Sequence, residues 1–136
     1  MESEASAFSA QRGMIHFDLD KMYCGHIKRG DIFLSEADNQ EKIVVVVQDN
    51  ILNERLSTVL AVPLEPHRPG EPVFKNEILL KPNETNLGRA SLALTHKLQA
   101  VDRRHLTAKK GELDPAKLSA LYAALDITLG KFRDRG

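Results

Sequence analysis

The run KIVVVVQ at residues 42–48 decides the fold, together with KRGDIFL at 28–34 before it and STVLAVPL at 57–64 after it. Ile32 and Leu34 lie two residues apart, so they share one side of a strand, because strand side chains alternate between faces. Four consecutive valines indicate a strand that is buried on both faces. We therefore predict three short strands in quick succession, with room for one helical turn at most between the last two.

The next part of the chain alternates apolar runs with turn residues. Pro63 and the loop that follows it are expected to end the third strand, because proline cannot donate to a sheet ladder. Beyond that loop we predict a strand at residues 73–80, a polar loop at 82–88 and a final strand at 90–98.

The C-terminal third changes to a helical period. Asp114 is a good N-cap, and Pro115 suits the first turn of a helix. Apolar residues then recur at steps of three and four and form one stripe, at Leu118, Leu121, Leu125, Leu129 and Phe132. Strands first and one helix last predict a mainly β, α+β fold, in which a small β-barrel of antiparallel strands is closed by a C-terminal α-helix.

Composition narrows the classes of function. The 136 residues carry 19 Lys plus Arg and 19 Asp plus Glu, so no net charge attracts a polyanion to the whole surface. An aromatic content of 5% without Trp disfavours a base-stacking platform and a groove for proline-rich peptides. The single Cys excludes an internal disulfide. With no signal peptide and no apolar run of about eighteen residues, we expect a cytoplasmic protein that does not contact a membrane.

The N-terminal residues differ from the rest of the chain. Residues 1–13 are small, polar and acidic without a period, which predicts a disordered arm. Residues 14–17 are apolar enough to form an extra strand, and this alternative stays open. We therefore divide the chain into an N-terminal extension at 1–26, partly disordered, and one domain at 27–136.

Five pieces of the domain resemble the MazF/PemK family, small endoribonucleases of toxin–antitoxin pairs. They are RGDI at 29–32, the valine strand ending in Gln48, the STV strand running to Leu64, AVDRRHL at 100–106 and the terminal helix. The resemblance implies an SH3-like barrel that forms a homodimer. It implies cleavage of single-stranded RNA at a short sequence, without a metal or other cofactor. It also implies a cognate antitoxin protein that occupies the same groove.

Cleavage of this kind requires three tasks at one phosphate. The ribose 2′-hydroxyl loses a proton and attacks phosphorus, the leaving 5′-oxygen gains a proton, and charge on the phosphoryl oxygens needs cationic or donor groups. The products are a 2′,3′-cyclic phosphate and a 5′-hydroxyl. The resemblance places the family's reactive arginine on Lys42 and its hydroxyl on Thr58, with Ser57 beside it. Lysine supplies a point charge in place of arginine's planar fork, so this exchange is not conservative.

Many relatives carry an acidic residue where this chain has His96, at the end of the final predicted strand. Because histidine titrates near neutral pH and suits proton transfer, we predict a catalytic set of Lys42, Thr58 and His96. Loops at strand ends on a small barrel commonly line its binding face. We expect RNA contacts from five side chains, those of Arg29, Gln48, Asn53, Arg55 and Ser57. The basic run at 103–105 is more typical of a solvated turn.

A second function remains open from the sequence. Relatives usually carry a long Gly-rich loop between the first two strands, where this chain has only EADNQE at 36–41. That short acidic loop and Lys42 also fit a catalytically degenerate barrel. Such a barrel is a protein-binding module, either like the gyrase-poisoning toxins of the same architecture or binding only an antitoxin.

Overall fold

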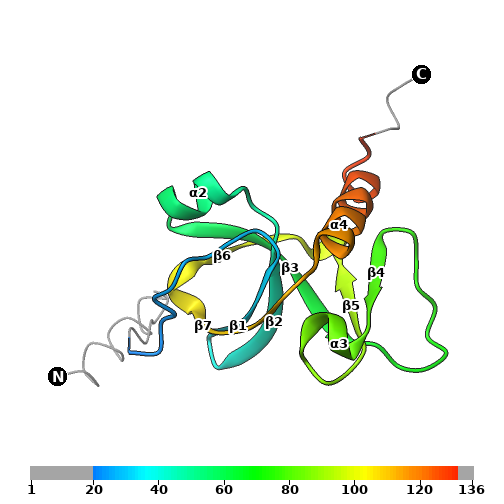
Figure 1. Ribbon diagram of the computed structural model, residues 1–136, viewed down its shortest axis with the longest axis horizontal. Coiled ribbons are helices and arrows are strands. Elements are labelled where there is room, and N and C mark those ends of the chain that lie inside the picture. Colours follow the sequence, from blue (N-terminus) through cyan, green and yellow to red (C-terminus); the bar gives the residue numbers. More distant parts are fainter. Residues whose placement is uncertain (1–19, 132–136) are drawn as a thin grey trace.

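The computed structural model describes residues 20–131 (Figure 1). Seven strands, three α-helices and two short 3-10 helices follow one another within this range. They are β1 (Asp31–Ala37), β2 (Gln40–Val46), α2 (Asn50–Arg55), β3 (Thr58–Pro66), β4 (Glu77–Leu80), α3 (Pro82–Thr85), β5 (Ser91–Leu94), η1 (Thr95–Lys97), β6 (Gln99–Asp102), η2 (Arg103–His105), β7 (Leu106–Glu112) and α4 (Pro115–Thr128).

The strands form one antiparallel sheet. Its path of pairing runs β4-β5-β3-β2-β1-β7, and β6 pairs with β3 as well. The start of β3 lies opposite β6, whereas its last three residues lie opposite β5. The predicted α+β class, an antiparallel sheet followed by a C-terminal helix, is confirmed. The path has two ends, at β4 and β7, so the sheet is open where we predicted a closed barrel.

A tight hairpin joins β1 to β2. Its turn consists of Asp38 and Asn39, whose φ angles are 52° and 63°. Two successive residues with positive φ match the twist of the flanking strands, and Asp and Asn tolerate such angles better than most residues. The strands consequently extend into the predicted loop, with Glu36 opposite Glu41 and Ala37 opposite Gln40. The hairpin therefore presents a short rim and does not cover the neighbouring surface.

Alternation along the strands divides the apolar residues between two cores. The first core contains Ile32 and Val45, and α4 covers it with Leu121 and Leu125. The second core lies on the other face of β1 and β2, where Phe33, Val44 and Val46 are the alternate residues. Val59 and Val101 of β3 and β6, and Leu106 of β7, complete this second core.

The C-terminal helix begins as predicted. The Asp114 side chain accepts a hydrogen bond from the backbone N–H of Lys117 at 2.8 Å, and Pro115 stands in the first turn. Leu121 and Leu125 are buried, whereas Leu129 is 67% exposed. Phe132, the last residue of the predicted stripe, lies outside the described residues. In Figure 1, α4 lies beside β4 and β5, and it contacts β4 and η1.

Several predicted boundaries were wrong after residue 63. Pro63 lies inside β3 opposite Val44, and the strand continues to Pro66. Only the last four residues of the predicted strand at 73–80 form β4, and the predicted loop at 82–88 contains the short helix α3. Lys81 and Glu84 cap that helix, a capping pair that the sequence reading did not use.

Two strands were missed. The segment at 90–98 is not the final strand, because β6 and β7 follow it. Both are polar or mixed in sequence, so neither shows the alternation that identifies a strand. Their pairing partners stabilise them, with β6 lying on β3 and β7 on β1. At Gly111 of β7 an added Cβ would lie 2.5 Å from the carbonyl oxygen of Thr85, so only glycine permits this approach to α3.

The packed part of the chain begins before Ile27. The backbone N–H of Tyr23 donates to the carbonyl of Leu106 at 2.7 Å. The Tyr23 ring meets Phe33 edge-on, with ring centroids 4.8 Å apart. The predicted disordered arm at 1–13 and the alternative strand at 14–17 lie outside the described residues. None of the helices within residues 20–131 has the length and apolarity needed to cross a membrane.

Candidate functional site

The second face of the sheet becomes polar toward the β1–β2 hairpin. Val44 is buried in the second core, and Lys42 and Gln40 follow on the same face of β2 at steps of two residues. Ser35 of β1 lies directly opposite Lys42. The alternation that builds the core therefore continues past its edge and presents polar side chains there.

A cavity of about 390 Å³ opens at this polar end, and we call it the Thr58 cavity. One wall comes from the hairpin and includes Ser35, Gln40 and Lys42. The other wall comes from β3, β6 and η2, and its residues are Thr58, Gln99, Ala100, Val101, Asp102 and His105. The two side chains predicted to react, the Lys42 amine and the Thr58 hydroxyl, thus line one concave surface.

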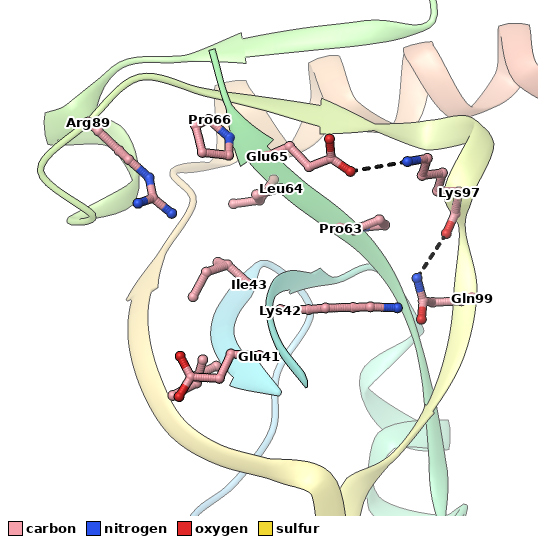
Figure 2. A pocket seen from close by; sticks show the side chains of 11 residues that line it. Glu41, Lys42, Ile43, Pro63, Leu64, Glu65, Pro66, Arg89, Lys97 and Gln99 are labelled. Atoms are coloured by element: carbon pink, nitrogen blue, oxygen red, sulfur yellow. Dashed lines mark hydrogen bonds and ion pairs between the residues drawn. The ribbon is translucent and has the colours of Figure 1, made fainter. Parts of the chain in front are cut away.

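A second cavity of about 410 Å³ adjoins the first, and we call it the Arg89 cavity (Figure 2). Lys42 and Gln99 line both cavities, and Figure 2 shows the Lys42 side chain extending toward Gln99. Prolines and aliphatic side chains supply much of the remaining wall, from Leu34, Ile43, Pro63, Leu64 and Pro66. An apolar wall with cationic side chains is suited to a flat ring that carries a phosphate.

The charges of the Arg89 cavity are mixed. Arg89, Lys97 and Lys42 provide three cations, and Glu41 and Glu65 provide two carboxylates. Lys97 is paired with Glu65 at 3.1 Å, and both side chains are about half exposed, so water screens this pair. Arg89 and Lys42 are therefore the cations that the cavity can present to an anion.

Gln48 and Asn53 lie inside the fold, although we predicted that they contact RNA. Asn53 is only 1% exposed. Gln48 Nε2 donates to Asn53 Oδ1 at 3.0 Å, and Asn53 Nδ2 donates back to the Gln48 carbonyl at 2.9 Å. Gln48 Nε2 also donates to the carbonyl of Thr58 at 3.0 Å. These hydrogen bonds hold the start of β3 in place, and they therefore also fix the position of Thr58.

The other three predicted RNA contacts are exposed, but they do not line the Thr58 cavity. The Arg29 guanidinium stacks on the Tyr122 ring of α4, 5.6 Å from its centroid. Burial raises the pKa of Tyr122 above its ordinary value, and the charge of Arg29 partly opposes that rise. Arg55 stands on α2, and Ser57 borders a separate cavity beside Tyr23 and Arg103.

The two histidines near the site have different environments. His96, the predicted proton-transfer group, is exposed on η1 and is absent from the walls of both cavities. His105 is 7% exposed and lines the Thr58 cavity. We did not predict His105 as a site residue, because a basic run such as 103–105 is more typical of a solvated turn. The sequence Asp-Arg-Arg-His-Leu at 102–106 could have indicated that His105 is held in place, because a capping residue precedes the basic run and an apolar residue follows it.

A charged pair stiffens the wall beside His105. Asp102 accepts from Arg104 Nε at 3.0 Å and from Arg104 Nη2 at 2.8 Å, in a two-pronged geometry. The side-chain bonds from Arg104 hold the pKa of Asp102 below its ordinary value. Asp102 also caps η2 by accepting from the Arg104 backbone N–H at 2.9 Å. Asp102 lies opposite Thr58 in the β3–β6 pairing, so both residues belong to one rigid wall.

The described residues do not form a metal site of the usual kind. Within residues 20–131, no three His, Cys, Asp or Glu side chains gather as ligands. The titratable and hydroxyl groups of the Thr58 cavity include the Lys42 ammonium, the Thr58 hydroxyl, the His105 imidazole and the carboxylates of Asp38 and Asp102.

Comparison with known proteins gives a family and a fold. A family model described as PemK-like, MazF-like toxin of type II toxin-antitoxin system matches residues 28–129. No curated protein matches the chain in sequence.

Solved structures match the chain over most of its length. An endoribonuclease from Mycobacterial species, in complex with its cognate antitoxin, is 20% identical with a TM-score of 0.67, covering 76% of this chain and 94% of its own. The MazE-MazF structure (Form-II) from Deinococcus radiodurans is 16% identical with a TM-score of 0.65, covering 79% and 98%. The Mycobacterium tuberculosis toxin MazF-mt6 is 17% identical with a TM-score of 0.64, covering 74% and 96%. At these identities the structural matches establish the shared fold alone.

Proposed function

We propose that this chain, which belongs to the PemK-like, MazF-like toxins of type II toxin–antitoxin systems, is an endoribonuclease that cleaves single-stranded RNA. The cut proceeds by attack of the ribose 2′-hydroxyl on the adjacent phosphorus. It leaves a 2′,3′-cyclic phosphate and a 5′-hydroxyl, and it needs no metal or other cofactor.

The observation that supports this most directly is the shared surface of Lys42 and Thr58. An ammonium and a hydroxyl that line one cavity can both reach a single phosphate. Lys42 stabilises the charge that develops on the phosphoryl oxygens, and the Thr58 hydroxyl orients an oxygen or the attacking group. Proton transfer needs a third group. The sequence suggested His96, but His96 lines neither the Thr58 cavity nor the Arg89 cavity.

Substrate contacts extend the site beyond the reacting phosphate. The Arg89 cavity adjoins the Thr58 cavity across Lys42 and Gln99, so a neighbouring nucleotide fits there with its phosphate near Arg89. Ser57, Arg55 and Arg29 remain candidates for contacts farther along the strand. Gln48 and Asn53 act on the substrate only indirectly, through the position of Thr58.

We also propose the partners and the compartment of this protein. One of the similar structures is an endoribonuclease in complex with its cognate antitoxin, and another is a MazE-MazF structure. By that analogy the chain binds a cognate antitoxin protein. The homodimer and the action in the cytoplasm are what we expect of a member of this toxin family.

Incubation with a mixed-sequence single-stranded RNA in EDTA tests the proposal. We expect discrete cuts whose new 5′-hydroxyl ends accept phosphate from a polynucleotide kinase directly. Thr58→Val keeps the shape and backbone bonds of the strand but removes the hydroxyl, and we expect a rate loss of about 100-fold. A 2′-deoxy oligonucleotide is the matched control, because it lacks the attacking group. Cutting of the 2′-deoxy control, or no cutting of RNA at all, would contradict this mechanism.

The short hairpin favours a second candidate function. Its turn has only two residues, Asp38 and Asn39, and Lys42 lacks the fork that holds two phosphoryl oxygens. A protein-binding module that has lost catalysis tolerates both features. Intact RNA after long incubation, together with tight binding of a protein partner at this surface, would favour the module over the enzyme.

A further inference from the structure

His105 occupies a position that the proposed function has not used. His105 is only 7% exposed, and it lines the Thr58 cavity from η2. It also lines a third cavity of about 390 Å³, which includes Lys21, Glu36 and Arg104. His105 therefore stands between the Thr58 cavity and the third cavity, and Lys42 stands between the Thr58 cavity and the Arg89 cavity.

Interactions on both sides of His105 fix its backbone. Before it, the Arg103 side chain donates to the Asn53 carbonyl at 2.9 Å, and the Arg103 N–H donates to the Ser57 carbonyl at 2.9 Å. After it, Leu106 is fully buried, and its carbonyl accepts from the Tyr23 N–H at 2.7 Å. A histidine seated in this way loses little further freedom when a substrate binds, and such preorganisation favours catalysis.

We propose that the His105 imidazole, and not His96, is the catalytic base for the cleavage, an inference that rests on the proposed function. The imidazole takes the proton of the ribose 2′-hydroxyl as the 2′-oxygen bonds to phosphorus. The bond from phosphorus to the 5′-oxygen breaks, and that oxygen takes a proton from the Lys42 ammonium. Water then removes the proton from the imidazolium and returns one to the lysine, so no net proton is gained.

The geometry supports this division of roles. In-line displacement places the attacking and the leaving oxygen on opposite sides of phosphorus, so the base and the acid must approach from different directions. His105 and Lys42 line the Thr58 cavity from different elements, η2 and β2. Ser35 of β1 lies between them, because it pairs with Leu106 on one side and with Lys42 on the other. His96, in contrast, is exposed on η1 and lines neither the Thr58 cavity nor the Arg89 cavity.

Other titratable and charged groups face His105 from the surrounding elements. In the Thr58 cavity they are Lys42 of β2, Asp38 of the hairpin turn and Asp102 of β6. In the third cavity they are Lys21, Glu36, Glu41 and Arg104. These groups are four carboxylates and three cations, so charges of both signs surround the ring.

The test compares His105→Gln with the matched control His96→Gln in the full chain. We expect His105→Gln to lower kcat by about 100-fold with little change in KM, whereas His96→Gln keeps the rate of the native chain. The rate of the native chain should rise with pH across the imidazole range, and His105→Gln should lose that rise. A purely structural role would not change the shape of the pH profile. Retention of the full rate and of the pH profile in His105→Gln overturns the proposal, as does a lost rise in His96→Gln.

Two further measurements separate chemistry from folding. Binding of an uncleavable 2′-deoxy oligonucleotide by His105→Gln should match the native chain, because its Lys42, Thr58 and Arg89 are unchanged. If His105→Gln does not fold, His105→Ala with added imidazole replaces it, and recovery of the rate by imidazole supports the proposal. No recovery in a folded His105→Ala protein that still binds the oligonucleotide counts against it. A native chain that cuts no RNA contradicts the proposed function, whereas equal cutting by the native chain and His105→Gln contradicts only this inference.

Discussion

The two faces of the central strands are built from alternate residues of the same chain segments, and they differ in what lies over them. The first face carries Ile32 and Val45 and is covered by α4. The second face carries Phe33 and Val44, has a smaller core, and becomes polar at Lys42 and Thr58. Within the described residues, Lys42 and Thr58 are exposed at that polar end, so their side chains are accessible to a ligand.

The covered face therefore mainly stabilises the fold, and the open face carries the candidate site. On the covered face, apolar surface is removed from water, which is the main source of folding free energy. On the open face, polar side chains are held by the backbone bonds of β3, β6 and η2, and they contribute little burial. Substitutions on the first face should therefore change the free energy of unfolding, and substitutions at the polar end should change the cleavage rate.

The largest expected effect is on the covered face. Leu121→Ala should lower the free energy of unfolding by about 3 kcal/mol, because it leaves a cavity between α4 and the sheet. Urea denaturation measures this loss, and the folded fraction should keep its cleavage rate. Leu129→Ala, at the exposed C-cap of the same helix, is the matched control and should change stability by less than about 0.5 kcal/mol. Equal effects of the two substitutions would mean that α4 does not cover the first core.

On the open face, Lys42→Ala should lower kcat/KM for RNA by about 100-fold, equivalent to about 2.7 kcal/mol of transition-state stabilisation. Its free energy of unfolding should stay nearly unchanged, because the side chain is exposed. Lys42→Arg should restore only part of the rate, since the guanidinium keeps the charge and offers a planar fork but does not give up a proton to the leaving oxygen. Lys75→Ala, an exposed lysine in the loop before β4, should leave the rate as it is. A full rate for Lys42→Ala would remove this residue from the chemistry.

The buried amide pair of Gln48 and Asn53 should affect both stability and cleavage. Asn53→Ala should lower the free energy of unfolding by about 2 kcal/mol, because Gln48 loses a partner inside the fold. It should also slow cleavage, since Gln48 then holds the Thr58 carbonyl less firmly. The exposed neighbour Glu54 offers a control, and Glu54→Ala should affect neither quantity. Lost activity in Asn53→Ala with unchanged stability would instead favour direct contact with RNA, as the sequence suggested.

The smallest effect concerns the pair of Asp102 and Arg104. The pKa of Asp102 is lowered in the folded chain, so its contribution to stability is present above the ordinary value of 3.8 and is lost as the pH falls through the lowered value. Asp102→Asn should therefore reduce the acid-induced loss of stability slightly, because the Arg104 side chain is 45% exposed and water screens the pair from that side. Urea denaturation at about pH 7 and again on the acid side of 3.8 compares the two proteins. A steeper acid loss in Asp102→Asn would contradict this assignment.

Much of the fold could be predicted because its signals are local. The valine run at 44–47 marked β2, and Asp114 with Pro115 marked the start of α4. The sequence missed β6 and β7, whose residues show little alternation and are strands because β3 and β1 pair with them. It also misjudged Pro63, whose place inside β3 depends on its position opposite Val44.

The sequence by itself determined which residue types were available and where the strongest strands and the last helix begin, because propensity, capping and alternation act over a few neighbouring residues. The tertiary structure alone decided which side chains meet. It turned Gln48 and Asn53 inward to satisfy each other, since a buried amide without a partner is costly, and it brought His105 to the wall that holds Thr58. Contacts between residues dozens of positions apart depend on how the whole sheet curves and pairs, and no local pattern records them.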